Sequence, residues 1–203
     1  MRYLLVIFMT LACGVASAQS IQQTGPNYFI AGVPTVEFEF MAAESVYGNQ
    51  RQANWCWAAC SQMVLNYHGL YVTQEQIVHH IYGDLVDRPA NANQIRRALS
   101  GWAPNIRGGY STIHCSSVVN HVNEITQALA YKWPLIVGLR NPNGGVGHAY
   151  VLTAIEYSVD QWNNTIPHYV ILRDPMPGTD GKIRVPWNVF ENRVMMMFKV
   201  WVN

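Results

Sequence analysis

Residues 50–60 read QRQANWCWAAC, and the rest of the chain is interpreted outward from this stretch. From Cys56 onward, the alanine content and the spacing of the apolar residues predict a helix that begins near this cysteine and continues to about His68. A thiol in the first turn of a helix faces unpaired backbone N–H groups and the positive end of the helix dipole, and both stabilise the thiolate. We therefore interpret Cys56 as a reactive nucleophile.

The composition is that of a folded and nearly neutral protein. Of the 203 residues, 50% are hydrophobic and 12% are charged, and 13 Lys and Arg residues against 12 Asp and Glu residues give a formal net charge of +1. A chain of this length forms one domain or two small lobes. Because a charge so close to zero offers no basic surface for nucleic-acid phosphates or anionic lipids, we expect neither as a partner, and we expect a monomer.

Residues 1–18 have the pattern of a secretory signal peptide. Arg2 supplies the positive start, an apolar run covers residues 3–12, and a group of small residues ends at Ala18. The apolar run is shorter than the ~20 residues needed to cross a bilayer. We therefore expect cleavage after Ala18 and a secreted or periplasmic chain that is not anchored in the membrane. Lipid attachment at Cys13 is the less favoured alternative.

Three cysteines follow the predicted signal peptide: Cys56, Cys60 and Cys115. An exported protein meets conditions that permit disulfides, so the odd number needs an explanation. Residues four apart on a helix have Cβ atoms about 5–6 Å apart, whereas a disulfide needs about 3.5–4.5 Å. Cys56 and Cys60 should therefore not pair with each other. Since Cys60 lies one turn further into the helix and lacks the field at its start, we predict a disulfide between Cys60 and Cys115.

Helical and β-rich patterns are segregated along the chain. Residues 19–47 are interpreted as an irregular lead-in or short propeptide with one strand over 36–40. Further helices are predicted from Thr73, with a capping box at its start, over 93–99 and over 122–130. Five strands are predicted in the second half, over 135–139, 149–157, 169–173, 183–185 and 194–202. This segregation predicts an α+β fold with a helical N-terminal half, an antiparallel β C-terminal half and a cleft between them.

A thiolate nucleophile needs a base and a third group that orients the base. His148 is the favoured base because a glycine-rich loop, 143–147, precedes it and a strand follows it. Asp174 is the favoured orienting group because an apolar strand delivers it and Pro175 ends that strand. Taken alone, each has a structural alternative: a histidine at a strand end, and an ordinary Asp-Pro turn.

An oxyanion also needs hydrogen-bond donors, and Gln50 and Gln52 both precede Cys56 closely enough to supply a side-chain amide. A polar surface loop is the alternative interpretation of both. His79 and His80 lack a second pair of ligands at metal-binding spacing, so we expect adjacent surface histidines and no metal.

These residues resemble the active-site segments of papain-like cysteine peptidases. The cysteine segment consists of a Gln, five intervening residues and then Cys-Trp at the start of a helix. Its CWAAC form resembles the branch that contains secreted bacterial avirulence-effector proteases. The sequence GHAYVL at 147–152 matches the histidine segment. The strand that ends in Asp174-Pro175 resembles the bacteriocin-processing peptidases, in which Asp replaces the Asn of papain. The resemblance covers about residues 50–178.

The resemblance implies a two-lobed papain-like domain over residues 48–203 with the active site in the cleft between the lobes. It also implies that Cys56 is the nucleophile and His148 the base. Asp174 is then the orienting residue and Gln50, rather than Gln52, the side-chain donor of the oxyanion hole. No metal or organic cofactor is implied. The chain departs from papain in its shorter length, in lacking the cysteine three residues before the nucleophile, and in lacking a large prodomain.

The implied activity is that of a cysteine endopeptidase that hydrolyses protein or peptide substrates through an acyl-enzyme. Two alternatives remain open because fold and nucleophile do not specify the substrate. One is a thiol amidase or acyl transferase acting on a non-protein amide such as peptidoglycan, and the other is a catalytically silent exported binding module. We expect core packing for Trp55, Trp57 and Trp187, with a cover over the catalytic His and Asp, as in papain, as the alternative for Trp187.

Overall fold

The structure is a computed structural model that describes residues 20–42, 48–104, 108–110, 112–119, 121–144 and 147–202. The predicted signal peptide, the cleavage point after Ala18 and Cys13 lie outside the described residues. Within them, no helix combines the length and the apolar character needed to span a membrane.

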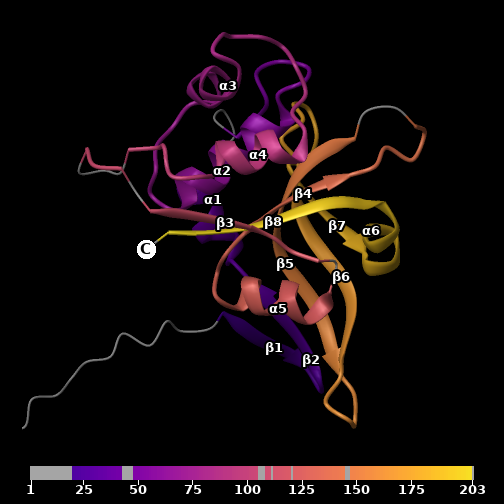
Figure 1. The fold of residues 1–203 in the computed structure, drawn as a ribbon. Helices are drawn as coiled ribbons and strands as arrows, with labels where there is room; N and C mark the ends of the chain where they lie inside the picture. The colour runs from indigo at the N-terminus through magenta and orange to yellow at the C-terminus, as the bar shows by residue number, and fades with distance from the viewer. Residues whose placement is uncertain are drawn as a thin grey trace, which may run out of the picture.

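Six helices and eight strands are found in the described residues (Figure 1). The helices are α1 (Thr35–Ala42), α2 (Cys56–Tyr67), α3 (Gln74–Tyr82), α4 (Ala92–Ala98), α5 (Val122–Ala130) and α6 (Trp187–Arg193). The strands are β1 (Ile21–Gly25), β2 (Tyr28–Gly32), β3 (Ile113–Ser117), β4 (Leu135–Leu139), β5 (His148–Val159), β6 (Thr165–Arg173), β7 (Lys182–Pro186) and β8 (Val194–Val202).

All strand pairs in the sheet are antiparallel. The main path runs β1-β2-β5-β4-β8-β3, and β6 and β7 extend from the other side of β5. The long strand β5 therefore pairs with β4 through its first residues, with β2 through its later residues, and with β6 along its opposite edge. Because β5 begins at His148, this residue lies at the end of a strand that is paired on both sides within the sheet.

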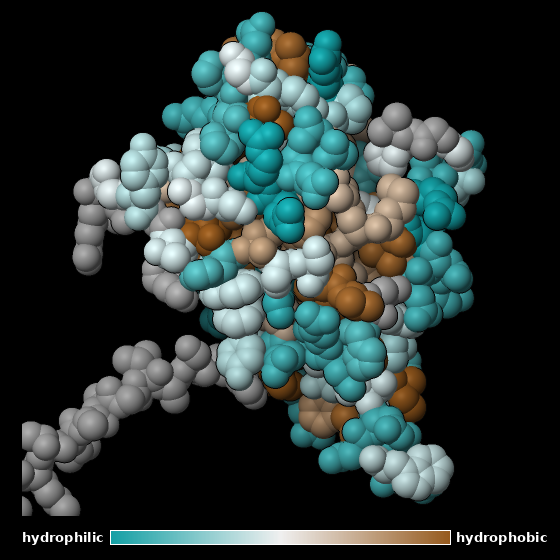
Figure 2. Space-filling model, viewed as in Figure 1, coloured by the Kyte–Doolittle hydropathy of each residue, from teal (hydrophilic) through white to brown (hydrophobic). Residues whose placement is uncertain are grey.

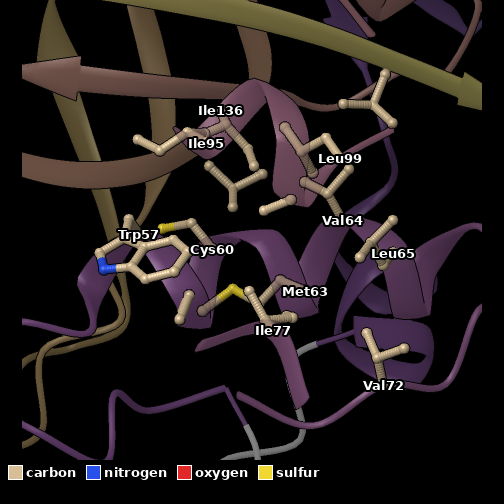
Figure 3. Packing of buried hydrophobic residues seen from close by; sticks show 14 of the residues in the cluster. Trp57, Cys60, Met63, Val64, Leu65, Val72, Ile77, Ile95, Leu99 and Ile136 are labelled. Carbon is tan, nitrogen blue, oxygen red and sulfur yellow. The ribbon is translucent and has the colours of Figure 1, made fainter. Parts of the chain in front are cut away.

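Two cores lie on opposite faces of the sheet. One packs α2, α3 and α4 against residues such as Ile136, Val151 and Val200, and the other packs α5 and α6 against residues such as Val137 and Leu152. Alternate residues of one strand enter different cores, as the two-residue period of a strand requires. Figure 3 shows Trp57, Cys60, Met63 and Val64 of α2 within the first core. In Figure 2 the face shown is mainly hydrophilic, with scattered hydrophobic residues.

The N-terminal segment differs from its prediction. Residues 36–40 belong to helix α1 and not to a strand, because the alternating apolar residues do not share a buried face: Phe38 is fully buried, whereas Val36 and Phe40 are 79% exposed. The segment before it is the hairpin β1–β2 and not an irregular lead-in, and β2 pairs with β5 from Tyr28 to Gly32. Residues 20–42 therefore complete the sheet and cover α2.

Most of the other elements agree with the sequence. The bounds of α5, β4 and β8 are those predicted, and α3 begins with the predicted capping box of Thr73 and Gln76. Strand β3 and helix α6 had no prediction. The α+β class is confirmed, but the segregation is less strict than expected because β1, β2 and β3, which precede the strands predicted from residue 135 onward, also join the sheet.

Candidate active site

Helix α2 begins at Cys56 and places its thiol at the N-terminal end of the helix. Trp55 occupies the N-cap and makes no side-chain capping hydrogen bond, so the N–H groups of the first turn remain available. The Trp57 N–H interacts with the Cys56 sulfur. This is the environment that the sequence predicts for a stabilised thiolate.

The sheet brings His148 and Asp174 to the same place. His148 is the first residue of β5, and Asp174 follows the last residue of β6. Since β5 and β6 are antiparallel and Val151 faces Arg173, the end of β6 lies beside the start of β5. Two residues 26 positions apart in sequence therefore become neighbours.

The imidazole of His148 is held by Asp174. Its Nε2 atom lies 2.8 Å from Oδ1 of Asp174, and the two side chains are 22% and 11% exposed. The same Oδ1 accepts a hydrogen bond of 2.9 Å from the backbone N–H of Met176, which fixes the carboxylate. With Nε2 directed to Asp174, Nδ1 is the nitrogen left for the Cys56 thiol, which interacts with the same imidazole.

The charges of this group favour a thiolate beside an imidazolium. Burial disfavours ionisation of Cys56, but hydrogen bonds from His148 and from the Ala149 N–H outweigh it and lower the pKa of the thiol. Burial likewise disfavours the charged form of His148, but hydrogen bonds to Asp174 and Cys56 raise its pKa to about 9. The arrangement can therefore supply both a nucleophile and a proton donor near neutral pH.

The predicted disulfide is absent, and Cys60 and Cys115 are both free thiols. Cys60 is buried on α2, which packs against β5 and β4, whereas Cys115 lies on the edge strand β3 and faces Val200 of β8. Strand β8 separates β3 from β4, so the two cysteines occupy different parts of the same core. Burial raises the pKa of Cys60 well above its usual value and that of Cys115 to about 11. Neither is a competing nucleophile near neutral pH.

Gln50 is buried, but its amide is used within its own loop. Its Nε2 donates to the backbone carbonyls of Gln52 and Ala53 at 3.0 and 2.9 Å, and its Oε1 is buried without a hydrogen-bond partner. Its backbone N–H donates to the carbonyl of Pro175 at 2.7 Å, which ties the loop before Cys56 to the loop after Asp174. In this conformation Gln50 stabilises the loop before Cys56 and does not direct a free N–H to the thiol. The side chain of Gln52 is exposed.

Tyr150 contacts the His148 imidazole, whereas Trp187 and His80 pack elsewhere in the fold. Trp187 packs with Phe190 against the second core, as expected. Tyr150 instead contacts the imidazole of His148 edge-on, with ring centroids 4.7 Å apart. No signal in the sequence singled out Tyr150, although its position two residues after His148 on β5 places both on one face. His80 stacks on Trp102, and no cluster of potential metal ligands occurs in the described residues.

A cleft opens beside the Cys56 thiol. Its open part has a volume of about 320 Å³, and it is lined by Ala53, Asn54, Cys56, Pro89, Asn141, Gly147, His148, Tyr150, Asp174 and Met176. Next to it lies a smaller pocket of about 100 Å³, which shares Cys56, Pro89, Gly147 and His148 with the cleft. The thiol, the imidazole and the carboxylate therefore meet at a space that a polypeptide can enter.

A sequence model of the Peptidase C39 like family matches residues 44–201, which include Cys56, His148 and Asp174. The chain belongs to this family. Because the family is one of peptidases and the fold is similar to that of a C39 peptidase domain, the chain is a papain-like cysteine peptidase. No curated protein sequence matches it.

Solved structures similar to this C39-like chain include two peptidase domains. The peptidase domain of Streptococcus ComA, a bifunctional ABC transporter involved in quorum sensing, has a TM-score of 0.50 and 15% identity, and the match covers 76% of this chain and 94% of that domain. A double glycine motif protease from an AMS/PCAT transporter, in complex with the leader peptide, has a TM-score of 0.48 and 18% identity, with 76% and 87% covered. The likeness to the ComA domain confirms the predicted papain-like fold.

Proposed function

We propose that this C39-like peptidase is exported and cleaves peptide bonds through Cys56, His148 and Asp174. The observation that carries the proposal is the position of His148, whose imidazole interacts with the Cys56 thiol and with the Asp174 carboxylate, 2.8 Å away. This is the arrangement of a nucleophile, a base and an orienting group. Export rests on the signal-peptide pattern of residues 1–18.

The first half of the reaction forms an acyl-enzyme. The Cys56 thiolate attacks the carbonyl carbon of the peptide bond, a C–S bond forms, and the carbonyl oxygen becomes an oxyanion. As the oxyanion collapses, the C–N bond breaks and the His148 imidazolium gives its proton to the departing amine. Asp174 keeps the imidazole oriented throughout, and a thioester on Cys56 remains.

Water completes the reaction. The neutral imidazole of His148 accepts a proton from water, the resulting hydroxide attacks the thioester carbonyl, and the C–S bond breaks to release the carboxylic acid. The thiolate and the imidazolium are thereby restored. No atom of a metal or an organic cofactor enters either half of this scheme.

The oxyanion requires donors, and the start of α2 offers backbone N–H groups that lack side-chain caps. Gln50 serves as a further donor only if its side-chain amide gives up its hydrogen bonds to the carbonyls of Gln52 and Ala53 and donates to the oxyanion instead. We therefore assign the main contribution to the backbone of α2 and a supporting contribution to Gln50.

The test is to incubate the protein, as processed on export, with a denatured proteome and to identify new peptide N-termini by mass spectrometry. Wild type and Cys115→Ser should produce the same new termini, whereas Cys56→Ala and His148→Ala should produce none. New termini from the Cys56→Ala protein would exclude Cys56 as the nucleophile. Inactivity of the wild type on peptides, together with release of amines from peptidoglycan, would replace the peptidase assignment by an amidase.

A further inference from the structure

A row of aromatic rings crosses the sheet near its β3 edge. The rings follow one another in the order Tyr131, Trp133, Trp201 and His114, with neighbouring centroids 5.2, 5.4 and 5.2 Å apart and planes within 28° of parallel. They come from the connection between α5 and β4, from β8 and from β3, and Figure 1 shows β8 and β3 side by side. Segments far apart in the sequence thus supply one continuous aromatic row.

Core packing does not account for the whole row. Tyr131 is 38% exposed, and the other three rings are also partly exposed. On β8, Val200 enters the first core, whereas Trp201 points to the opposite face and belongs to neither core within the described residues. Centroid separations above 5 Å correspond to offset stacking, so each ring leaves part of its neighbour's face uncovered.

The turn that carries Tyr131 and Trp133 contains a lysine where glycine is usual. The N–H of Lys132 donates to the Leu129 carbonyl at 2.9 Å, and that of Trp133 donates to the Ala128 carbonyl at 3.0 Å, which is the Schellman pattern at the end of α5. Lys132 has φ of 59°, in the left-handed region that disfavours a side chain. A lysine under this strain indicates a use for its ammonium group.

A pocket of about 350 Å³ opens beside one end of the row, which is a volume typical of small-molecule sites. Its lining includes Tyr131 and Trp133 of the row together with Glu37, Tyr67, His68 and Lys132. Tyr67 ends α2, the helix that begins at Cys56, and 12 residues make this helix ~18 Å long. Among the described residues, the pocket shares no lining residue with the cleft beside Cys56. A ligand bound here leaves that cleft open.

The side chains that line this pocket are polar but balanced in charge. Glu37 accepts from Lys132 Nζ at 2.7 Å and from the Tyr67 hydroxyl at 3.2 Å. His68 Nε2 lies 3.1 Å from the Val200 carbonyl, and burial lowers the pKa of this histidine to about 4, so its ring is neutral. The ammonium, the carboxylate and the hydroxyl all keep unused hydrogen-bonding positions. The pocket therefore offers donors and acceptors to an uncharged ligand.

The charges along the row also favour an uncharged ligand over a polyanion. Lys199 lies 5.9 Å from the centre of the Trp201 ring, but its Nζ is paired with Glu124 at 3.4 Å. Lys132 is likewise paired, with Glu37. Proteins that bind single-stranded nucleic acids on aromatic rows, or anionic lipids at a surface, add an excess of positive charge. Here a carboxylate neutralises each of the two lysines.

We propose that the aromatic row and the adjoining pocket bind an extended chain of uncharged β-linked pyranose sugars. The flat faces of such sugars carry C–H groups that pack on aromatic rings, and their hydroxyl groups match the donors and acceptors of Glu37, Lys132 and Tyr67. The site goes beyond the proposed peptidase function and does not depend on it. It would hold the enzyme on a polysaccharide while the catalytic cleft stays open.

The test uses two neutral oligosaccharides, cellohexaose and chitohexaose, and isothermal titration calorimetry of the protein as processed on export. At least one of them should bind saturably to the wild type. Tyr131→Ala and Trp133→Ala should each weaken this binding at least about fivefold, since each removes one ring from the row. The matched control is Trp162→Ala, which removes a tryptophan that is 73% exposed on the turn between β5 and β6. This control should bind as the wild type does.

Lys132→Gly separates a binding role from a structural one. Glycine adopts the left-handed turn without strain, so the free energy of unfolding in urea should not fall. Loss of the ammonium group should still weaken oligosaccharide binding at least about threefold. An unchanged rate of Cys56 alkylation by iodoacetamide identifies the variants that remain folded. Wild-type affinity in Lys132→Gly would remove Lys132 from the site.

Three results would overturn the proposal. One is the absence of saturable binding of both oligosaccharides to the wild type. Another is equal affinity in the wild type, Tyr131→Ala and Trp133→Ala, which would place the binding elsewhere. The third is binding of heparin hexasaccharide or of phosphatidylglycerol vesicles without binding of the neutral sugars, which would make the ligand anionic. The search for new peptide N-termini tests the peptidase function separately, so either proposal can fail while the other stands.

Discussion

The imidazole of His148 lies between two acidic groups: its Nε2 is 2.8 Å from Oδ1 of Asp174, and it also interacts with the thiol of Cys56. Asp174 stabilises the protonated imidazole, and the protonated imidazole stabilises the thiolate. The ion pair therefore predominates at pH values between the lowered pKa of Cys56 and the pKa of His148 near 9. In this range of pH Cys56 is a thiolate while His148 still holds the proton that the leaving amine needs.

The rate of peptide hydrolysis should have a bell-shaped dependence on pH. At low pH the rate falls as the Cys56 thiolate becomes protonated, and at high pH it falls near pH 9 as His148 loses the proton that the leaving amine needs. Alkylation by iodoacetamide needs only the thiolate, so it should share the acidic limb and keep its plateau at alkaline pH. Measuring kcat/KM and the alkylation rate from about pH 4 to about pH 11 checks both. An alkaline limb at the ordinary histidine pKa of 6.5 would contradict the coupling to Asp174.

Replacing Asp174 with asparagine should move the alkaline limb to lower pH. The amide of Asp174→Asn retains an oxygen for the Nε2–H but not the negative charge that raises the pKa of His148, so that pKa should fall from about 9. We expect kcat to fall by at least about tenfold, because the proton donor is then less populated at neutral pH. Asp180→Asn, which alters an exposed carboxylate in the same loop, is the control and should leave the profile unchanged. If the alkaline limb of Asp174→Asn is not shifted, the charge of Asp174 does not raise the pKa of His148.

The parts of the fold and site that could be predicted are those with a local signal. Helix α5 and strands β4 and β8 were bounded correctly because each has a clear local pattern: helical spacing of the apolar residues in α5, and short, nearly continuous apolar runs in β4 and β8. Cys56 and His148 could be selected for a similar reason, since each lies where a loop becomes a regular element.

The parts that could not be predicted depend on contacts between distant segments. The alternation at 36–40 fits a strand locally, but Phe38 packs against Tyr67 of α2 and the segment folds as a helix. The disulfide was inferred from an odd number of cysteines, whereas its formation depends on where β3 joins the sheet. The hydrogen bond that Asp87 accepts from the Asn54 N–H likewise has no local signal, because the two residues are 33 positions apart.

The number of free thiols distinguishes the structure from the predicted disulfide. All three described cysteines are free, so the unreduced protein, as processed on export, should show three reactive thiols after denaturation. In the native state at neutral pH, only Cys56 should react with iodoacetamide, because burial raises the pKa values of Cys60 and Cys115. Thiol titration with and without denaturant, followed by peptide mapping, measures both numbers. A single thiol in the denatured, unreduced protein, mapped to Cys56, would show that Cys60 and Cys115 are bridged.

A glycine on β2 tests whether the N-terminal segment is part of the folded enzyme. A Cβ atom at Gly32 would clash with the carbonyl oxygen of Thr153 and lie 2.6 Å from Cα of Ala154, and these backbone atoms of β5 move only if the strands separate. We therefore expect Gly32→Ala to lower the free energy of unfolding by about 1–3 kcal/mol.

Gly25→Ala is the matched control for this prediction, since it lies on the same hairpin and its Cβ would meet only Tyr28 Cβ at 3.6 Å. Its free energy of unfolding in urea should stay within about 0.5 kcal/mol of the wild type. The difference between the two variants should persist in the active enzyme, because the hairpin that carries both glycines pairs with the strand that begins at His148. If residues 19–47 were instead removed as a propeptide, the two active enzymes would be identical and would unfold at the same urea concentration.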